Sequence, residues 1–427
     1  FPVPDGLCVS TRAYEVFVRE HGLRQRIALE MGRKPFAQMR WEEIWDVSLR
    51  IRNLFAGCPL PPDLRTALAD PLEEHFAHRR VSVRSSAPGE DSGTTSFAGL
   101  HDSFVNVQGV QNMLERIKLV WASLWSDRAL MYRKELGLDP SQSVMAVVIQ
   151  DMVAGECSGI TFGKNPNDAS QAVIESVHGL NQGLVDGTVE PDRWLVDRAS
   201  GRVVAHHPAS ARDSIMIPSP GGVRLADCPP EQREVPPLDA SGLRRVFDLA
   251  MQAESQFGRP QDMEWTFQNN ELLLLQSRPI TTLTHAAEGD QRPWYLSLQR
   301  SFDNLQHLRS RIESERLPDM EREAAGLAGT VLASLDDAGL AWEIDLRRET
   351  YQHWSAIYRE EFIPMAHGMR LFGQVYNDTV RPDDPYEFMR LLGDTRLMSL
   401  RRNRWLEELA AMIREDAELA ADIQTGR

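Results

Sequence analysis

Four polar residues on two adjoining apolar segments have the types and spacing to do chemistry. They are Asp262, Glu264, Gln276 and Arg278, within QDMEWTFQNNELLLLQSRPIT, residues 261–281. Two acids two residues apart share one face of a strand, and Mg²⁺ favours a few carboxylates together with substrate phosphates. An arginine can bind a phosphate through two parallel hydrogen bonds. From the pattern alone, an exposed Asp262–Arg278 ion pair worth ~0–1 kcal/mol is the favoured interpretation, and a metal and phosphate site is the alternative.

The loop of the expected hairpin decides whether these polar groups share a face. A two-residue loop at Asn269–Asn270 would pair Met263 with Gln276 and would mix polar and apolar side chains on both faces. A three-residue loop centred on Asn270 separates them, and we expect that register. It predicts the cross-strand pairs Glu264–Gln276, Asp262–Arg278, Trp265–Leu275 and Phe267–Leu273.

Two further segments carry arginines suited to an anion. VRSSAPGEDSGTTSFAG, residues 83–99, is a strand with Arg84 near its end that runs into a loop rich in Gly, Ser and Thr. Backbone N–H groups and a guanidinium can hold an anion there, although the loop matches neither a Walker A sequence nor GxGxxG. A mobile surface loop is the alternative. Arg128, in WASLWSDRALMYRKE, would project near the same cleft or lie on a solvated helix face.

The elements that must position these residues follow from periodicity and turn signals. Helical spacing covers most of residues 11–80, and one long helix is expected over 110–137. The segment 213–239, rich in Pro, Gly and Asp, is expected to be a surface loop or flap. A helix over 243–258 precedes the hairpin. Further strands are expected at 79–87, 143–153, 158–163, 172–179, 192–198 and 201–207.

The same reading predicts the domain organisation. A first domain is expected over residues 1–285, with its two lobes dividing near residue 150, and a boundary near residue 285. Residues 286–427 show amphipathic helices and almost no strand pattern, so we expect a helical domain or the start of a middle domain. The chain opens on FPVPDG without a Met, and we expect it to be part of a longer protein.

Composition excludes several classes of function. The chain has 427 residues with 42% apolar and 26% charged residues, as in ordinary globular proteins. A net charge of −15 argues against general binding to nucleic acid or to an anionic membrane. No run approaches the ~20 apolar residues of a membrane helix. The 4 cysteines form no CxxC pair, so we expect no zinc site, no disulfide framework and a cytoplasmic location.

Taken in order, five segments resemble the nucleotide-binding domain of the phosphoenolpyruvate-utilising dikinases. They are VRSSAPGEDSGTTSFAGLHDSF, WASLWSDRALMYR, VVIQDMVAGECSGITF, IESVHGLNQGLVDGTVEPDRW and QDMEWTFQNNELLLLQSRPIT. That family includes phosphoenolpyruvate synthase, pyruvate phosphate dikinase, rifampin phosphotransferase and glucan water dikinase. The resemblance implies an α+β fold for residues 1–285, an ATP-grasp-like domain whose two lobes clasp ATP, followed here by an all-α segment.

The resemblance also implies roles for individual residues. Arg84, Arg128 and Arg278 resemble the catalytic arginines that bind phosphates, and Glu264, with Asp262 and Gln276, resembles the Mg²⁺ site. The backbone of residues 150–153 resembles the adenine-binding segment, Glu175 a ribose-side acid, and the loop SGTTSFAG a lid over the phosphates. The ATP-binding set implied is Arg84, Thr95, Ser96, Arg128, Gln150, Asp151, Met152, Val153, Glu175, Gln276 and Arg278.

The chain departs from the family pattern at three places. His178-Gly179-Leu180-Asn181-Gln182 stands where members commonly show Trp-Gly-Leu-Gly-Glu, so an acid is replaced by Gln182. The Gly-Gly-Lys segment at the start of members is not found in the sequence. The sequence contains a single Ser/Thr-His-Ala triplet, Thr284-His285-Ala286, at the end of the first expected domain, and no phosphohistidine domain is identified around it. The phosphohistidine domain would therefore be a partner, either elsewhere in a longer chain or on another protein.

The function implied is ATP binding and phosphoryl transfer in a dikinase. ATP would be cleaved to AMP, and the β-phosphoryl group would pass to a histidine on a separate domain, as in phosphoenolpyruvate synthase (pyruvate, water dikinase). One alternative is a rifampin-type antibiotic phosphotransferase, in which residues 286–427 begin an acceptor-binding domain. Another is a module that binds nucleotide without turnover, which the departures above favour and the retained arginines oppose.

Overall fold

The computed structural model describes residues 1–88, 100–165, 168–185, 187–280 and 308–392, together with 405 and 412. The chain divides into two compact units, Phe1–Arg370 and Leu371–Arg427. Helices and strands are mixed within the first unit, so the α+β class expected from the sequence is confirmed. The boundary predicted near residue 285 lies outside the described residues.

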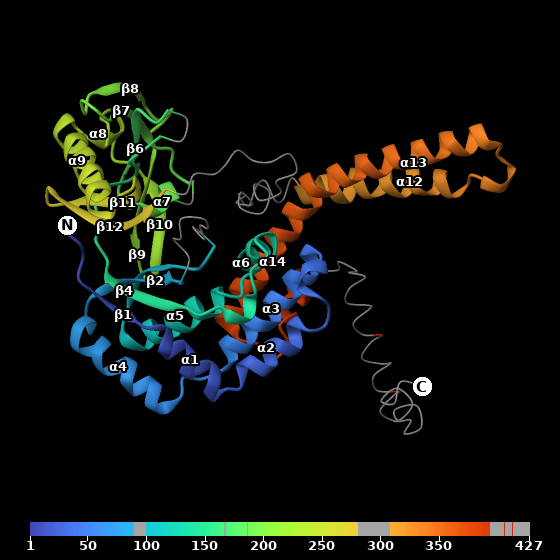
Figure 1. The fold of residues 1–427 in the computed structure, drawn as a ribbon, viewed down its shortest axis with the longest axis horizontal. Coiled ribbons are helices and arrows are strands. Elements are labelled where there is room, and N and C mark those ends of the chain that lie inside the picture. The colour runs from blue at the N-terminus through green and yellow to red at the C-terminus, as the bar shows by residue number, and fades with distance from the viewer. Residues whose placement is uncertain are drawn as a thin grey trace. The chain divides into compact units, whose positions relative to one another are not determined.

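The first sheet consists of the antiparallel strands β1 (Gly6–Val9), β4 (Ala146–Asp151), β2 (Arg80–Ser86) and β3 (Phe104–Gln108), in that order. Alternation along β2 gives it two faces: Val81 and Val83 are fully buried in the core, whereas Ser82 and Arg84 belong to the other face. Helices pack under the apolar face (Figure 1). They are α1 (Thr11–Glu20), α2 (Leu23–Met31), α3 (Trp41–Gly57), α4 (Pro62–Phe76), α5 (Val110–Ser123) and α6 (Asp127–Glu135).

One helix predicted from the sequence is two helices in the structure. The expected helix over 110–137 breaks after α5 ends at Ser123, and α6 begins at Asp127. The cause is a local cap, because the Ser126 side chain accepts a hydrogen bond of 3.2 Å from the Ala129 N–H. The break turns α6 to a new direction, and Arg128 sits in its first turn.

The second sheet is antiparallel throughout, in the order β12-β11-β5-β6-β7-β8. Helix α9 (Ala240–Phe257) packs on it and ends at Gly258, as the sequence predicted (Figure 1). Gly159 is required where the sheet is most crowded, because a Cβ there would lie 2.3 Å from the Trp265 ring and 2.2 Å from the Glu175 carbonyl oxygen. The strands are β5 (Cys157–Phe162), β6 (Gln171–His178), β7 (Asp192–Asp197), β8 (Val203–His207), β11 (Gln261–Gln268) and β12 (Glu271–Pro279).

The segment expected as a surface loop over 213–239 is instead a hairpin followed by a short helix. Strands β9 (Ser214–Ser219) and β10 (Gly222–Asp227) pair antiparallel, and α8 spans Pro230–Arg233. The expectation of a loop without strands was wrong because the Pro and Gly residues supply the tight turn of a hairpin, with Gly221 at φ 76°. The hairpin joins the two sheets: Gly179 forms a bridge with Met216, and the Asn106 side chain of β3 donates to the Ser219 and Gly222 carbonyls at 2.5 and 2.8 Å.

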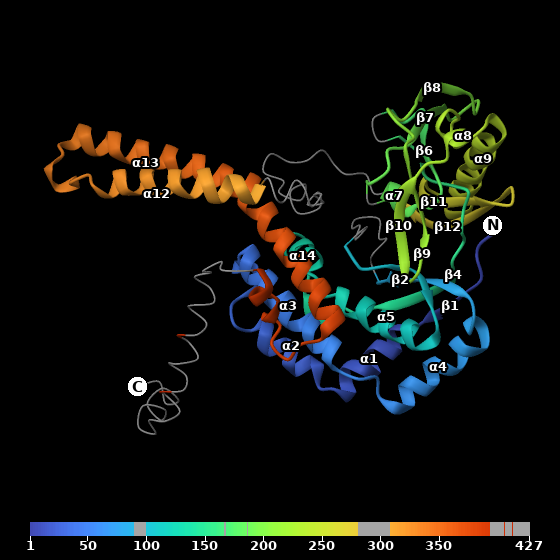
Figure 2. The same ribbon diagram turned by 180° about the vertical axis from the view of Figure 1, so that it is seen from behind.

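Helices form most of the described part of 308–392. Helices α12 (Leu317–Ala328) and α13 (Asp337–Ile357) lie side by side in opposite directions (Figure 2). Two hydrogen bonds join them, from the Trp354 indole to Glu323 and from Arg347 to the Leu327 carbonyl, both at 2.7 Å. Helix α14 spans Ile363–Val380, and single π-helical turns at Ile312–Arg316 and Tyr358–Phe362 precede α12 and α14.

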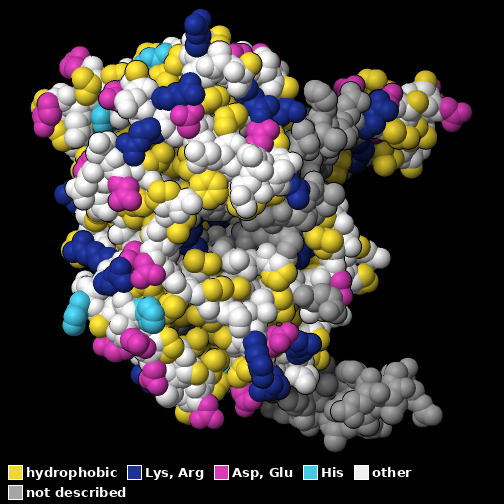
Figure 3. All heavy atoms as spheres, turned by 60° about the vertical axis from the view of Figure 1, so that its left-hand side comes forward, with side chains coloured by type: hydrophobic (Ala, Val, Ile, Leu, Met, Phe, Trp, Pro, Cys, Tyr) yellow, Lys and Arg dark blue, Asp and Glu magenta, His cyan; other side chains and the backbone are white. Residues whose placement is uncertain are grey.

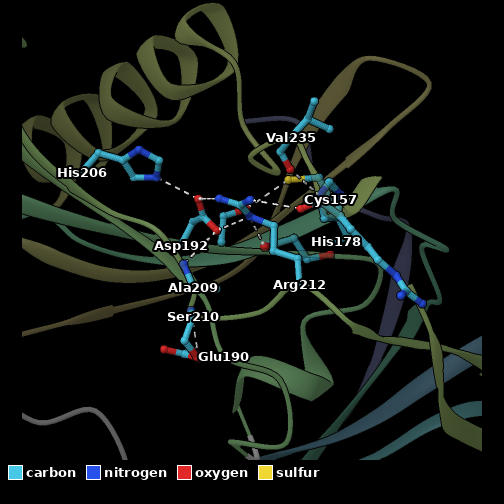
Figure 4. A network of polar contacts seen from close by, with 12 residues as sticks. Cys157, His178, Glu190, Asp192, His206, Ala209, Ser210, Arg212 and Val235 are labelled. Atoms are coloured by element: carbon cyan, nitrogen blue, oxygen red, sulfur yellow. Dashed lines mark hydrogen bonds and ion pairs between the residues drawn. The ribbon is translucent and has the colours of Figure 1, made fainter. Parts of the chain in front are cut away.

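A buried acid network stabilises the far end of the second sheet. The Asp192 side chain is fully buried, and both of its oxygens accept hydrogen bonds of 2.7 Å from Arg212 (Figure 4). His206 donates to the same carboxylate at 2.7 Å and stacks on the Trp194 ring. Burial raises the pKa of Asp192, but the bonds from Arg212 and His206 outweigh burial and hold the pKa below its ordinary value.

The surface carries charges of both signs. Lys, Arg, Asp and Glu side chains are interspersed over the face drawn in Figure 3, and the surface is hollowed between its upper and lower parts. Within the described residues, no helix is both long and apolar enough to cross a membrane.

Candidate functional site

A cleft of about 330 Å³ lies between the two sheets. Its lining is mostly polar, and every wall comes from an element described above. The first sheet and the segment after β4 contribute Ser82, Arg84, Gln150, Asp151, Met152 and Val153, and α6 contributes Arg128. The second sheet and the turn after β6 contribute Ser158, Asn181, Gln182, Glu264, Thr266, Leu275, Gln276 and Arg278.

The cross-strand register of the polar residues is confirmed. Glu264 pairs with Gln276 and Asp262 pairs with Arg278. Three of these four side chains line the cleft, whereas Asp262 lies buried behind Arg278. The sequence pattern therefore placed the polar face of the hairpin correctly.

The loop length and the apolar pairs were predicted wrongly. The turn has two residues, Asn269 and Asn270, both with left-handed backbone at φ 50° and 61°. Trp265 pairs with Leu274, and Phe267 with Leu272. A β-bulge after Glu264 restores the polar register: Leu275 is the additional residue on β12, and its side chain lines the cleft.

Arg84 contacts both oxygen groups of the opposite wall. Its guanidinium donates to the Glu264 carboxylate at 2.9 Å and also to the Gln276 amide oxygen. The side chains of Arg84 and Glu264 are 21% and 19% exposed, so this contact is open to a ligand from the cleft. The arrangement holds the Arg84 guanidinium against two oxygen acceptors where the two sheets meet.

Arg278 is oriented by a buried acid. Its Nε and Nη2 lie 2.7 and 2.6 Å from Asp262 Oδ2, and Asp262 is only 7% exposed. The sequence pattern alone favoured this ion pair over a site. The structure contains the pair, and it also places the Arg278 side chain in the lining of the cleft.

Arg128 and His101 form the floor near α6. Burial lowers the pKa of the half-buried Arg128 from its ordinary value, the charge of Asp102 partly offsets this, and Arg52 lowers the pKa further. His101 is buried and donates from Nδ1 to the Ser123 carbonyl at 3.3 Å. Burial, followed by the charge of Arg133, lowers its pKa to about 4, so His101 is neutral at pH 7.

The oxygen donors on β11 and β12 fit a hard divalent cation that keeps most of its ligands from water and phosphate. The Glu264 carboxylate and the Gln276 amide oxygen both face the cleft and converge on one guanidinium. Mg²⁺ uses one or two protein carboxylates in such sites. Across the described ranges, no group of three or more His, Cys, Asp or Glu side chains is arranged to hold a metal.

The remaining predicted residues are distributed as follows. Gln150, Asp151, Met152 and Val153 line the cleft together. Glu175 lies outside its lining, on β6, where it makes an ion pair of 3.5 Å with Arg193. Thr95 and Ser96 lie outside the described residues.

Several lining residues were not predicted. Ser158 and Thr266 lie on neighbouring strands, with their hydroxyl oxygens 2.8 Å apart. Both occur in segments read only as strands, so no local signal identified them. Asn181 and Gln182 stood out in the sequence only as departures from a pattern.

Comparison with known proteins identifies a family for most of the chain. Residues 1–294 match the family model of the AMP/ATP-binding domain of pyruvate phosphate dikinase. A probable phosphoenolpyruvate synthase of Methanocaldococcus jannaschii is 30% identical over 289 residues, 66% of this chain and 24% of the relative. Rifampicin phosphotransferases of Bacillus cereus and Streptomyces sviceus are 35% and 36% identical over 283 and 290 residues, 66% and 67% of this chain and 32% and 33% of each relative.

The matched region contains both sheets and the whole lining of the cleft. The chain spans about a quarter to a third of the length of these three relatives. Over residues 1–294, the chain belongs to the family of the pyruvate phosphate dikinase AMP/ATP-binding domain.

Proposed function

We propose that residues 1–285 form an ATP-grasp-like domain that holds Mg²⁺-ATP between its two sheets. The observation that carries the proposal is the contact of Arg84 on one wall with Glu264 and Gln276 on the other. A cation and two oxygen groups that meet in an open cleft can each bind part of a metal–phosphate complex. Membership of an ATP-binding family supports the same conclusion.

The arginines would bind the phosphates. Arg84 would exchange Glu264 and Gln276 for phosphate oxygens, which are stronger acceptors for a guanidinium. Arg278 is held by Asp262 before any ligand arrives, and such preorganised donors stabilise charge that develops during phosphoryl transfer. Arg128 adds a third positive charge from α6.

The oxygens released by Arg84 would hold the metal. Glu264 and Gln276 are the residues we assign to Mg²⁺, and Asp262 supports them by fixing Arg278. Bound there, Mg²⁺ would neutralise charge on the phosphates during transfer. The backbone of 150–153 would bind the adenine, and Thr95 and Ser96 would close over the phosphates.

In the complete protein, we propose a dikinase reaction of the phosphoenolpyruvate synthase type. The bond between the α- and β-phosphoryl groups breaks to release AMP, and the β-phosphoryl group passes to a histidine of a separate domain and then to the enol oxygen of pyruvate. The bond between the β- and γ-phosphoryl groups also breaks, and the γ-phosphoryl group is transferred to water and leaves as phosphate. A second candidate is transfer to a rifamycin antibiotic. Rifampicin phosphotransferases match this chain at 32–36% identity and phosphoenolpyruvate synthases at 30–33%, so both acceptors are kept as candidates.

Two measurements test the proposal. Isothermal titration of this chain with ATP and MgCl₂ should give one site, and a chain that binds no ATP would refute the proposal. The complete protein should release AMP and label a histidine from ATP labelled at the β-phosphorus. Pyruvate-dependent and rifampicin-dependent AMP release distinguish the two acceptors, whereas binding without any label on histidine would indicate a nucleotide-binding module.

A further inference from the structure

Asn181 carries a buried carboxamide in the lining of the cleft. Asn181 is only 8% exposed, and neither its Nδ2 nor its Oδ1 has a hydrogen-bond partner among the described residues. Its backbone is fixed, since its carbonyl accepts hydrogen bonds from Leu184 and Val185 at 3.0 Å each. A desolvated amide without a partner is unfavourable, and native proteins rarely retain one without a reason. A bound ligand would supply both missing partners.

Contacts on the second sheet show at which end of the cleft Asn181 lies. Glu264 and Thr266 are successive cleft-facing residues of β11, about 7 Å apart along the strand. Thr266 contacts the Ser158 hydroxyl at 2.8 Å, and Ser158 donates to the Gly179 carbonyl at 2.6 Å. Asn181 follows Gly179 by two residues in the sequence. It therefore lies beyond Thr266, on the side of the cleft away from Arg278.

The first sheet shows the same order of residues along the cleft. Two residues before Arg84 on β2 lies Ser82, which pairs with Gln150 at the end of β4. The chain then continues through Asp151, whose carboxylate is held by Arg79, into the uncharged Met152 and Val153, and all three line the cleft. Both walls thus lead away from Arg84 and Arg278 to residues without a positive charge, and in the proposed ATP complex this end receives the nucleoside.

We propose that the Asn181 carboxamide binds the ribose hydroxyls of ATP. Its Nδ2 would donate to one hydroxyl oxygen, and its Oδ1 would accept from the neighbouring hydroxyl. A vicinal diol offers a donor and an acceptor side by side, which matches the two unpartnered atoms of one carboxamide. The proposal rests on the binding of ATP in this cleft and adds a residue that selects a ribonucleoside.

The test uses the 427-residue chain and compares Asn181→Leu with wild type by titration calorimetry. Leucine keeps a similar shape and removes both polar atoms. We expect ATP and AMP to bind roughly 10- to 100-fold more weakly, from the loss of two hydrogen bonds. Inorganic triphosphate should bind unchanged, because it engages only the arginine end. Wild type should also prefer ATP to 2′-deoxy-ATP, and the variant should lose that preference.

Three results would overturn the inference. One is unchanged ATP affinity in Asn181→Leu, and another is an equal loss for ATP and inorganic triphosphate, which would indicate a general disturbance of the cleft. A variant that still prefers ATP to 2′-deoxy-ATP but no longer distinguishes ATP from GTP would indicate a contact to the base. If wild type binds no ATP at all, the proposed function fails instead.

Two controls make the result independent of folding. The variant should melt no earlier than wild type, because the change removes a buried amide that has no partner without ligand. Asn181→Ala should show the same pattern of ligand losses if leucine disturbs the turn. Asn112→Leu, at an exposed position of α5 outside the cleft, should bind ATP as wild type does.

Discussion

The Arg84 guanidinium lies 2.9 Å from the Glu264 carboxylate, and this hydrogen bond joins β2 of the first sheet to β11 of the second. Gln276 accepts a second bond from the same group. A ligand that carries both a metal and phosphates must break these contacts and can replace each of them. Arg84 and Glu264 should therefore contribute to ATP binding in different ways, Arg84 through the phosphates and Glu264 through the metal. Mutations can separate these two contributions.

Replacement of Arg84 should weaken ATP binding with little effect on stability. A hydrogen bond to a charged group contributes ~1.5–3 kcal/mol, so Arg84→Met should lower the affinity for ATP by roughly 10- to 100-fold. The partly exposed ion pair contributes only ~0–1 kcal/mol to the free energy of unfolding. Titration calorimetry and urea denaturation measure the two effects. Arg244→Met, which removes an exposed partner of Asp248, is the matched control and should bind ATP normally.

Replacement of Glu264 should change the response to Mg²⁺. Glu264→Gln keeps the shape and removes the negative charge, so the gain in ATP affinity on adding MgCl₂ should shrink or vanish. Without Mg²⁺, the variant should bind ATP at least as well as wild type, because a carboxylate no longer repels the phosphates. Calorimetric titrations with ATP, with and without MgCl₂, measure this gain in affinity. An intact Mg²⁺ effect in the variant would show that another residue holds the metal.

His101 makes stability depend on pH. Its pKa in the folded protein is about 4, below the ordinary 6.5 of an unfolded chain. The neutral form is favoured by folding, so the contribution is full above pH 6.5 and is lost as the pH falls toward 4, by about 3 kcal/mol. Urea denaturation between pH 7 and pH 4 should show this loss. His101→Gln should reduce the slope, and the exposed His75→Gln should leave it unchanged.

The Asp192 network should be important for folding. Asp192→Asn leaves Arg212, whose side chain is 15% exposed, without its charged partner, and we expect a loss of ~3–5 kcal/mol in the free energy of unfolding at pH 7. Because the folded pKa of Asp192 lies below its ordinary value of 3.8, its contribution is present above that pH and disappears as the pH falls through the folded pKa. Asp248→Asn, from an exposed pair, should cost no more than ~1 kcal/mol.

Sequence reasoning succeeded where the physical rule is local. Alternation predicted the strands that became β2 and β4–β8, and Gly258 ended α9 with a left-handed backbone. It failed over 213–239, where Pro and Gly promote both loops and tight hairpins and only contact with β3 favours the hairpin. The cleft showed a similar division. Arg84, Arg128, Arg278 and Glu264 were predicted from the sequence and line the cleft, although Glu175 lies outside it, whereas Ser158, Thr266 and Asn181 entered the lining only through the pairing of distant strands.

The β12 bulge is the feature that neither the turn nor the polar pattern could predict alone. Two left-handed asparagines require a two-residue turn, and that turn alone would pair Met263 with Gln276. Because Leu275 bulges out of the pairing, Gln276 lies opposite Glu264 and Arg278 opposite Asp262. Deletion of Leu275 should therefore give a regular hairpin with the same polar pairs, and ATP binding should be retained.

The fold should survive this deletion, because β12 is the edge strand of its sheet and Leu272 and Leu274 keep their places in the core. Calorimetric titration with ATP, together with thermal melting, tests the prediction. Leu275→Ala is the matched control: it truncates the same side chain, keeps the bulge, and should retain most of the affinity. If the deletion variant lost ATP binding while Leu275→Ala kept it, the bulge itself, and not the polar register, would determine the site.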